Sequence, residues 1–162
     1  RDADDAPIAQ MVEQVEGWRD TGSSIGVSTF LVVLAESLLI AGRPKHARKV
    51  LASRLVRKRS AAERWLESDI HRLSGIALYA MKADLDQVNT ALHQAREVAV
   101  DQSARLLELR ALTEIAVFDA AHEAPDGAKA ALGELYGTFD EGLNSTVLET
   151  ARAALSGLDE QT

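Results

Sequence analysis

The sequence has no cysteine among its 162 residues. Without thiols the chain can form no disulfide, no thiolate metal site and no cysteine nucleophile, and this composition is typical of a reducing compartment. We therefore expect a cytoplasmic protein. Long apolar runs are also lacking, since the longest, at 30–41, contains Glu36 and Ser37. That run is too short and too polar to span a bilayer, so we expect a buried helix there and no membrane partner.

Aromatic residues and proline are scarce as well. Aromatics make up 4% of the chain and there are three prolines, whereas apolar residues in total reach 46%. A composition rich in alanine and leucine favours helices packed through small side chains over a β-sandwich. No segment alternates between apolar and polar residues over a useful length, so we predict an all-α protein without strands.

Periodicity and capping signals predict about eight helices. Gly42 suits the end of one helix, Pro44 and Pro125 suit the first turns of two others, and Asp84 suits an N-cap. A capping-box pattern starts at Ser60. The predicted helices cover about 6–20, 26–41, 44–58, 61–81, 85–100, 101 or 103 to 122, 125–136 and 146–156.

A helix-pair unit recurs about every forty residues. Leu51, Leu92 and Leu132 hold matching places, 41 and 40 residues apart. A period in this range indicates stacked helix pairs, each of which buries its apolar face against its neighbours. Gly75 lies inside a predicted helix, where glycine costs about 1 kcal/mol relative to alanine. We expect a neighbouring helix to pack closely there; a kink in the helix is the alternative interpretation.

The repeat resembles the tetratricopeptide repeat in its small residue on the first helix, its alanine about twelve residues later and its large apolar residue four further on. The segments ERWLESDIHRLSG at 63–75, LLELRA at 106–111 and LYGTFDEGLNSTVLETARAAL at 135–155 are similar to the C-terminal helical-repeat tail of large bacterial regulators. These are signal-transduction ATPases, adenylate-cyclase-like proteins and LuxR-type proteins. The resemblance covers about 15–158.

This resemblance implies a right-handed antiparallel helix-hairpin solenoid. We expect one helical-repeat domain over 1–162, with an orphan helix in 1–22, repeat segments at 24–60, 61–101 and 102–139, and a capping helix and tail at 140–162. The expected role is protein–protein interaction or intramolecular regulation in a bacterial signalling or transcription-regulatory protein, of which the chain would be one piece. No G-x-x-x-x-G-K-[ST] phosphate loop is present, so the relatives' ATPase activity is not expected here.

In the tetratricopeptide register the first helix of each pair lines a concave groove. Arg72 and Arg110 would each bind a carboxylate of a peptide, helix or neighbouring domain. In an alternative interpretation the groove charges are satisfied internally, with Asp69 paired to Arg72 three residues on. The candidate partner-binding residues are Glu36, Asp69, Arg72, Tyr79, Arg110 and Thr113.

The net charge is −7, yet eight of the 18 basic residues fall between Arg43 and Arg59 with no acid among them. Lys45, Arg48 and Lys49 are a possible phosphate-binding patch, and nucleic-acid binding there is an alternative function. A solvated outer face is the simpler interpretation of the same residues. Small-molecule sensing in the groove is a further alternative.

No catalytic constellation is visible in the sequence. The four histidines are scattered without an H-x-x-x-H pair, and no nucleophile stands beside a base. We therefore expect no enzyme, no metal and no cofactor. The expected partner is a protein, a peptide or upstream domains of the same polypeptide, and the oligomeric state is left open.

Overall fold

The computed structural model describes residues 10, 11, 13, 17, 26–53, 61–124 and 127–160. All regular secondary structure in these residues is helical, as the composition predicts. The elements are α2 (Val27–Ile40), α3 (Pro44–Leu51), the 3₁₀ helix η1 (Ala61–Leu66), α5 (Glu67–Ala80), α6 (Leu85–Asp101), α7 (Arg105–Ala121), α8 (Gly127–Tyr136) and α9 (Thr146–Asp159). Each of the described helices is too short or too polar to cross a bilayer.

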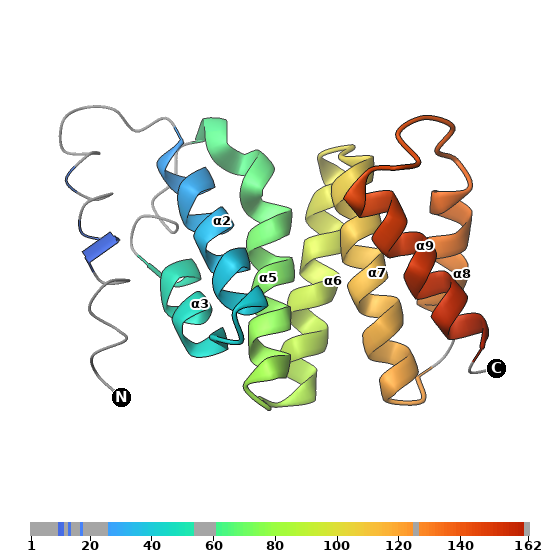
Figure 1. The fold of residues 1–162 in the computed structure, drawn as a ribbon, viewed down its shortest axis with the longest axis horizontal. Coiled ribbons are helices and arrows are strands. Elements are labelled where there is room, and N and C mark those ends of the chain that lie inside the picture. Colours follow the sequence, from blue (N-terminus) through green and yellow to red (C-terminus); the bar gives the residue numbers. More distant parts are fainter. Residues whose placement is uncertain are drawn as a thin grey trace.

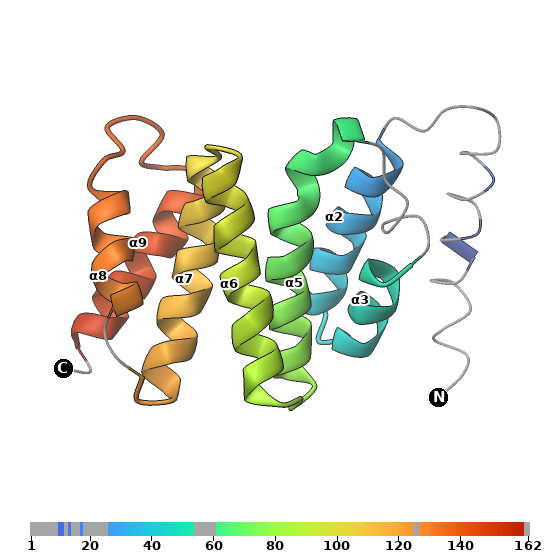
Figure 2. The same ribbon diagram turned by 180° about the vertical axis from the view of Figure 1, so that it is seen from behind.

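The helices stand side by side in an elongated array, with α2 and α3 at one end and α8 and α9 at the other (Figures 1 and 2). Helices that follow each other in sequence pack as pairs, α2 with α3, α5 with α6 and α7 with α8. In addition, α2 contacts α5, α5 contacts α7 and α7 contacts α9. We call α2, α5, α7 and α9 the first row. Side chains far apart in sequence therefore meet along this row.

Four helices end in the same backbone conformation. The residue after the last turn is left-handed at Gly42, Lys82, Ser103 and Glu123, with φ between 53° and 71°. In each case the next amide donates to a carbonyl five residues earlier, as in Arg43 N to Leu38 O at 2.8 Å. This is the Schellman arrangement, and it satisfies carbonyls that the helix end leaves unpaired. The prediction that Gly42 ends a helix is confirmed, and three other residue types adopt the same turn.

Small residues allow the helices to approach closely. Ala35 and Ala47 are fully buried between α2 and α3. A Cβ atom on Gly75 would lie 2.8 Å from Cγ of Leu92 on α6. The close packing expected at Gly75 is therefore confirmed, and it explains why a costly glycine is found inside α5.

Three predicted helix boundaries need correction. The helix predicted to reach residue 58 ends at Leu51, where its buried stripe of Ala47, Val50 and Leu51 is complete and a turn at Ala52 and Ser53 follows; residues 54–58 lie outside the described part of the chain. The helix predicted from residue 61 begins as the 3₁₀ turns of η1 and becomes α-helical at Glu67. The helix predicted from 101 or 103 starts at Arg105, since α6 still holds residue 101 and 103 is left-handed.

Other predicted helices lie where expected, with ends shifted by three residues or fewer. They are α2, α6, α8 and α9. The N-cap prediction for Asp84 is confirmed, because its side chain accepts from the amide of Asp86 at 2.9 Å. Ser145 caps α9 in the same manner. Most of the predicted orphan helix, together with Ser60 and Pro125, lies outside the described residues.

Candidate functional site

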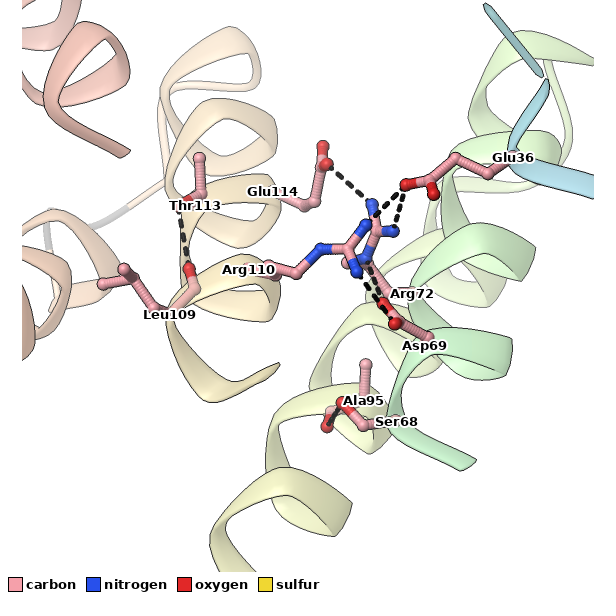
Figure 3. A network of polar contacts seen from close by, with 9 residues as sticks. All are labelled: Glu36, Ser68, Asp69, Arg72, Ala95, Leu109, Arg110, Thr113 and Glu114. Atoms are coloured by element: carbon pink, nitrogen blue, oxygen red, sulfur yellow. Dashed lines mark hydrogen bonds and ion pairs between the residues drawn. The ribbon is translucent and has the colours of Figure 1, made fainter. Parts of the chain in front are cut away.

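A buried arginine on α5 joins three helices of the first row. Arg72 is 4% exposed. Its Nε donates to Asp69 Oδ1 at 2.9 Å, one turn earlier on the same helix. Its Nη2 donates to Glu36 Oε1 on α2 at 2.8 Å, and its Nη1 donates to Glu114 Oε1 on α7 at 3.3 Å (Figure 3). All three nitrogens of the guanidinium are therefore engaged.

A second arginine shares two of these carboxylates. Arg110 on α7 donates from Nη1 to Asp69 Oδ2 at 2.8 Å and from Nη2 to Glu36 Oε1. Figure 3 shows the two guanidinium groups lying together between Asp69 and Glu36. We call Glu36, Asp69, Arg72, Arg110 and Glu114 the arginine–carboxylate network. Charged side chains that are this far buried persist when they are paired and hydrogen-bonded.

The carboxylates keep Arg72 charged. Burial by itself lowers the pKa of the Arg72 guanidinium. Attraction by Asp69 and the hydrogen bond that Asp69 accepts, followed by Glu114 and Glu36, raise this pKa above its ordinary value. Arginine is already protonated throughout the working range of proteins. Arg72 is therefore a fixed positive charge at the centre of the first row.

Local sequence explains the geometry of the network. Asp69 and Arg72 are three residues apart on α5, and Arg110 and Glu114 are four apart on α7, so each pair lies on one helix face. Between the latter two, the buried hydroxyl of Thr113 donates to the Leu109 carbonyl of its own helix at 2.8 Å. Each helix therefore brings an acid and a base to the same face of the array.

A cleft of about 220 Å³ opens over the network. Glu36, Arg72, Arg110 and Glu114 line it together with Thr113. The far wall belongs to α9, which contributes Thr146, Val147 and Thr150. We call this space the charged cleft. Its lining comes from all four helices of the first row, so it exists only when they are packed together.

A smaller apolar pocket of about 100 Å³ adjoins the charged cleft. Glu114 lines both spaces. The exposed walls of the apolar pocket include Tyr79 on α5 and Val117 on α7, and Phe118 also lines it. The Tyr79 and Phe118 rings meet edge to face with their centroids 5.7 Å apart. His122 lies against both rings, so the pocket has an aromatic rim.

The structure brings the candidate groove residues to one face of the array but divides them between the two spaces. Glu36, Arg72, Arg110 and Thr113 line the charged cleft, whereas Tyr79 lines the apolar pocket. Asp69 accepts hydrogen bonds from both arginines and does not itself line the charged cleft. Sequence reasoning missed Glu114 and the α9 wall. The four-residue spacing from Arg110 was the available signal for Glu114, while no local pattern indicated that α9 would close the cleft.

The role predicted for Arg72 needs correction. It was expected to bind a partner's carboxylate, but three carboxylates of the protein already occupy its nitrogens. The alternative interpretation, in which Asp69 pairs with Arg72, is the arrangement that the structure has. Arg72 therefore organises the cleft, and Glu36, Glu114 and Arg110 are the partly exposed members of the network.

The basic patch lies away from the cleft. Lys45, Arg48 and Lys49 are on α3, outside the first row, and neither described space includes them. Lys45 and Lys49 are exposed, and Arg48 is half-buried. Phosphate binding by these residues stays a prediction.

Among the described residues, no group of three or more histidine and acidic side chains is placed to hold a metal ion. Comparison with models of known families, with curated proteins and with solved structures finds no match to this chain.

Proposed function

We propose that this chain is a protein-interaction module of tetratricopeptide-like solenoid type, which binds a peptide segment or helix of a partner across the charged cleft and the apolar pocket. The pairing of α2 with α3, α5 with α6 and α7 with α8, together with contacts between alternate helices, supports the solenoid class. The four equivalent Schellman turns support it as well. In the bacterial signalling context that the sequence resemblance implies, the partner would be another protein or a domain of the same polypeptide.

The observation that carries this proposal is the shared wall of the two spaces. Glu114 separates a charged cleft from an apolar pocket, so one elongated partner can place a polar and an apolar side chain side by side. Recognition of a helix or peptide in a groove uses this combination of an apolar anchor with a polar one. Pockets for small molecules usually enclose roughly 300–1,000 Å³. The charged cleft, at about 220 Å³, is smaller, which favours side chains of a partner over a free ligand.

A blocking substitution tests whether the cleft binds. Thr150 is exposed on α9 and lines the charged cleft, so Thr150→Trp fills it without changing a charge. Ser156 is exposed on the same helix and does not line the cleft, and Ser156→Trp, which also changes no charge, is the matched control. Peptides would be selected by display against the purified parent chain, then synthesised and titrated by fluorescence anisotropy.

We expect Thr150→Trp to weaken binding of the selected peptides at least tenfold, about 1.4 kcal/mol, and Ser156→Trp to change it less than twofold. Circular dichroism of both variants should match the parent. Equal binding by the parent and Thr150→Trp would place the site elsewhere. A display experiment that selects no peptide would contradict the proposed function altogether.

A further inference from the structure

We infer that the partner segment presents a basic side chain to the charged cleft and an apolar side chain to the neighbouring pocket, about one helical turn apart. This inference rests on the proposed function and specifies the chemistry of its partner. It reverses the sign expected from the sequence, because there Arg72 and Arg110 were to attract a carboxylate. The reversal follows from the charge balance, the exposure and the spacing of described residues.

The charge balance of the network is negative. Its three carboxylates, Glu36, Asp69 and Glu114, face two guanidinium groups, so the formal charges sum to −1. The remaining residues that line the charged cleft are two threonines from α9, one threonine from α7 and a valine. None of them carries a charge that would offset the excess. The network is therefore one positive charge short of neutrality, whereas the residues that line the cleft, which do not include Asp69, sum to zero.

Glu36 and Glu114 are more exposed to solvent than the two arginines that they contact. The Glu36 and Glu114 side chains are 37% and 34% exposed, whereas the side chains of Arg72 and Arg110 are 5% and 25% exposed. Both arginines reach Glu36 through Oε1, and Arg72 reaches Glu114 through Oε1. Among the described residues, no contact from either arginine goes to the second oxygen of these two acids. Carboxylate oxygens that point to solvent accept hydrogen bonds from an ammonium or guanidinium group.

A partner carboxylate would instead be repelled by the exposed acids of the network. It would approach Glu36 and Glu114 before it reached the buried guanidinium nitrogens, and like charges that are desolvated together oppose binding. Arg72 uses three of its five N–H donors on Asp69, Glu36 and Glu114, and because its side chain is only 5% exposed, a partner carboxylate has little access to the other two. A lysine or arginine of the partner instead completes the network without breaking any bond.

The spacing of the partner's two side chains follows from α7. Glu114 lies at the boundary of the two spaces, and Val117 and Phe118 of the apolar pocket follow it by three and four residues. On a helix this separation is about one turn, roughly 5.4 Å. A partner helix that lies along α7 would match it with a basic and an apolar residue three or four positions apart. Val117 and Tyr79, 48% and 46% exposed, are the apolar surface that such a partner covers.

The test uses four synthetic helical peptides of about 16 residues, long enough for helix formation in an alanine-rich sequence. Three of them differ only in carrying Lys, Gln or Glu at one central position, with Leu four residues later. The fourth keeps the Lys and replaces that Leu with Ala. Binding to the full chain is measured by fluorescence anisotropy at low and at high salt.

The Lys/Leu peptide should bind at least tenfold more tightly than the Gln/Leu peptide, and the Glu/Leu peptide should bind most weakly. Loss of the Leu should also cost at least tenfold. The preference for Lys should shrink several-fold at high salt, because the cleft charges are partly exposed. Tightest binding by the Glu/Leu peptide, or equal binding by all three, would overturn the inference.

A conservative substitution tests whether Glu114 causes the preference for the Lys peptide over the Gln peptide. Glu114→Gln removes a charge while it keeps the shape of the side chain, and it affects only the longest bond of Arg72 (3.3 Å). We expect the Lys-to-Gln preference to fall several-fold in this variant. Glu149→Gln, an exposed position of α9 that does not line the cleft, should leave the preference unchanged. An unchanged preference in Glu114→Gln would contradict the inference, provided that its circular dichroism matches the parent.

The two proposals can fail separately. If neutral or acidic peptides bind and Thr150→Trp abolishes their binding, the cleft is an interaction site and the basic–apolar inference is wrong. If display selects no peptide and none of the four peptides binds, the proposed function is wrong as well.

Discussion

Arg72 and Arg110 donate to the same oxygen atom, Oε1 of Glu36. They also divide the two oxygens of Asp69 between them. Two guanidinium groups repel each other at this range, and the shared carboxylates overcome that repulsion. The first row is therefore joined by a set of charges in which removal of one member leaves the others unbalanced.

The first prediction concerns Arg72→Ala. Breaking a buried charge network from one side leaves carboxylates without partners, and it typically costs 3–5 kcal/mol. Because Glu36 and Glu114 are partly exposed, we expect a loss near the lower limit, about 3 kcal/mol, in urea unfolding followed by circular dichroism. Arg152→Ala, at an exposed position, should change the free energy of unfolding by less than about 0.5 kcal/mol. A loss below 1 kcal/mol for Arg72→Ala would show that the network contributes little.

The second prediction concerns Gly75→Ala. The new Cβ would lie 2.6 Å from Cδ2 and 2.8 Å from Cγ of Leu92, a side chain that is 3% exposed. Overpacking costs roughly 1–3 kcal/mol, while replacement of a helical glycine by alanine gains about 1 kcal/mol. We expect a net loss of about 1 kcal/mol in the free energy of unfolding.

A second background checks this mechanism. Leu92→Ala alone should cost about 2–5 kcal/mol, because it empties a buried site. In that background the contact is gone, so adding Gly75→Ala should stabilise the protein by up to about 1 kcal/mol. The same sign of effect in both backgrounds would exclude Leu92 as the cause.

The third prediction concerns the repeated turns. Lys82 has a left-handed φ of 57°, which costs an L residue about 1–2 kcal/mol. Lys82→Gly relieves that cost but gives the unfolded chain more freedom. We expect a net gain of about 0.5 kcal/mol, measured as a higher Tm. Gly42→Ala, at φ 71°, should lose about 1 kcal/mol. The reverse result, a loss for Lys82→Gly and a gain for Gly42→Ala, would indicate that these positions bear no backbone strain.

The fourth prediction is a pH dependence at Asp119. Burial raises the pKa of its carboxyl group, and His93 and His122 oppose this effect without cancelling it. A carboxyl group whose pKa is higher in the folded protein costs stability when it is ionised, and the cost disappears below its unfolded pKa of about 3.9. Asp119 also lies in the last turn of α7, where negative charge is unfavourable. Asp119→Asn should therefore raise the Tm at pH 7.

The gain in Tm that we expect for Asp119→Asn should shrink as the pH falls. As the pH falls toward the range in which carboxyl groups titrate, the Asp119 carboxylate of the parent becomes protonated and its cost to stability is lost. A thermal-unfolding series from pH 7 to pH 4 measures the difference. Glu97→Gln, at an exposed site on α6, should show no comparable trend, and a difference that grows toward acid would contradict the assigned direction of the pKa shift.

The sequence predicted the parts of the fold that depend on local signals. Gly42 and Asp84 act as their residue types suggest, and Gly75 marks a close approach of two helices. The end of α3 at Leu51 and the 3₁₀ start of η1 were missed. Helix ends of this kind depend on which side chains find a core to pack against, and periodicity alone does not show that.

The candidate site, like the fold, could be predicted from the sequence only in part. The row of first helices was expected to bring Glu36, Arg72 and Arg110 together, and the structure does so. Which of these charges remains available to a partner depends on how contacts across 36 to 74 residues satisfy each nitrogen and oxygen. A single sequence holds no local trace of that pairing, so the sign of the charge that the cleft would attract could be argued only from the packed structure.

The separation of Glu36 from Arg110 by 74 residues also orders the assembly of the protein. Each helix-pair turn closes over a few residues, whereas this bond closes a loop through both intervening helix pairs, and longer loops are entropically costlier to close. The turns should therefore form early and the Glu36–Arg110 contact only after the row is complete. Contacts made after the folding transition state affect mainly the unfolding rate. The network would then slow mainly the unfolding of the protein, so it sets how long the assembled row persists. It would have little influence on the folding rate.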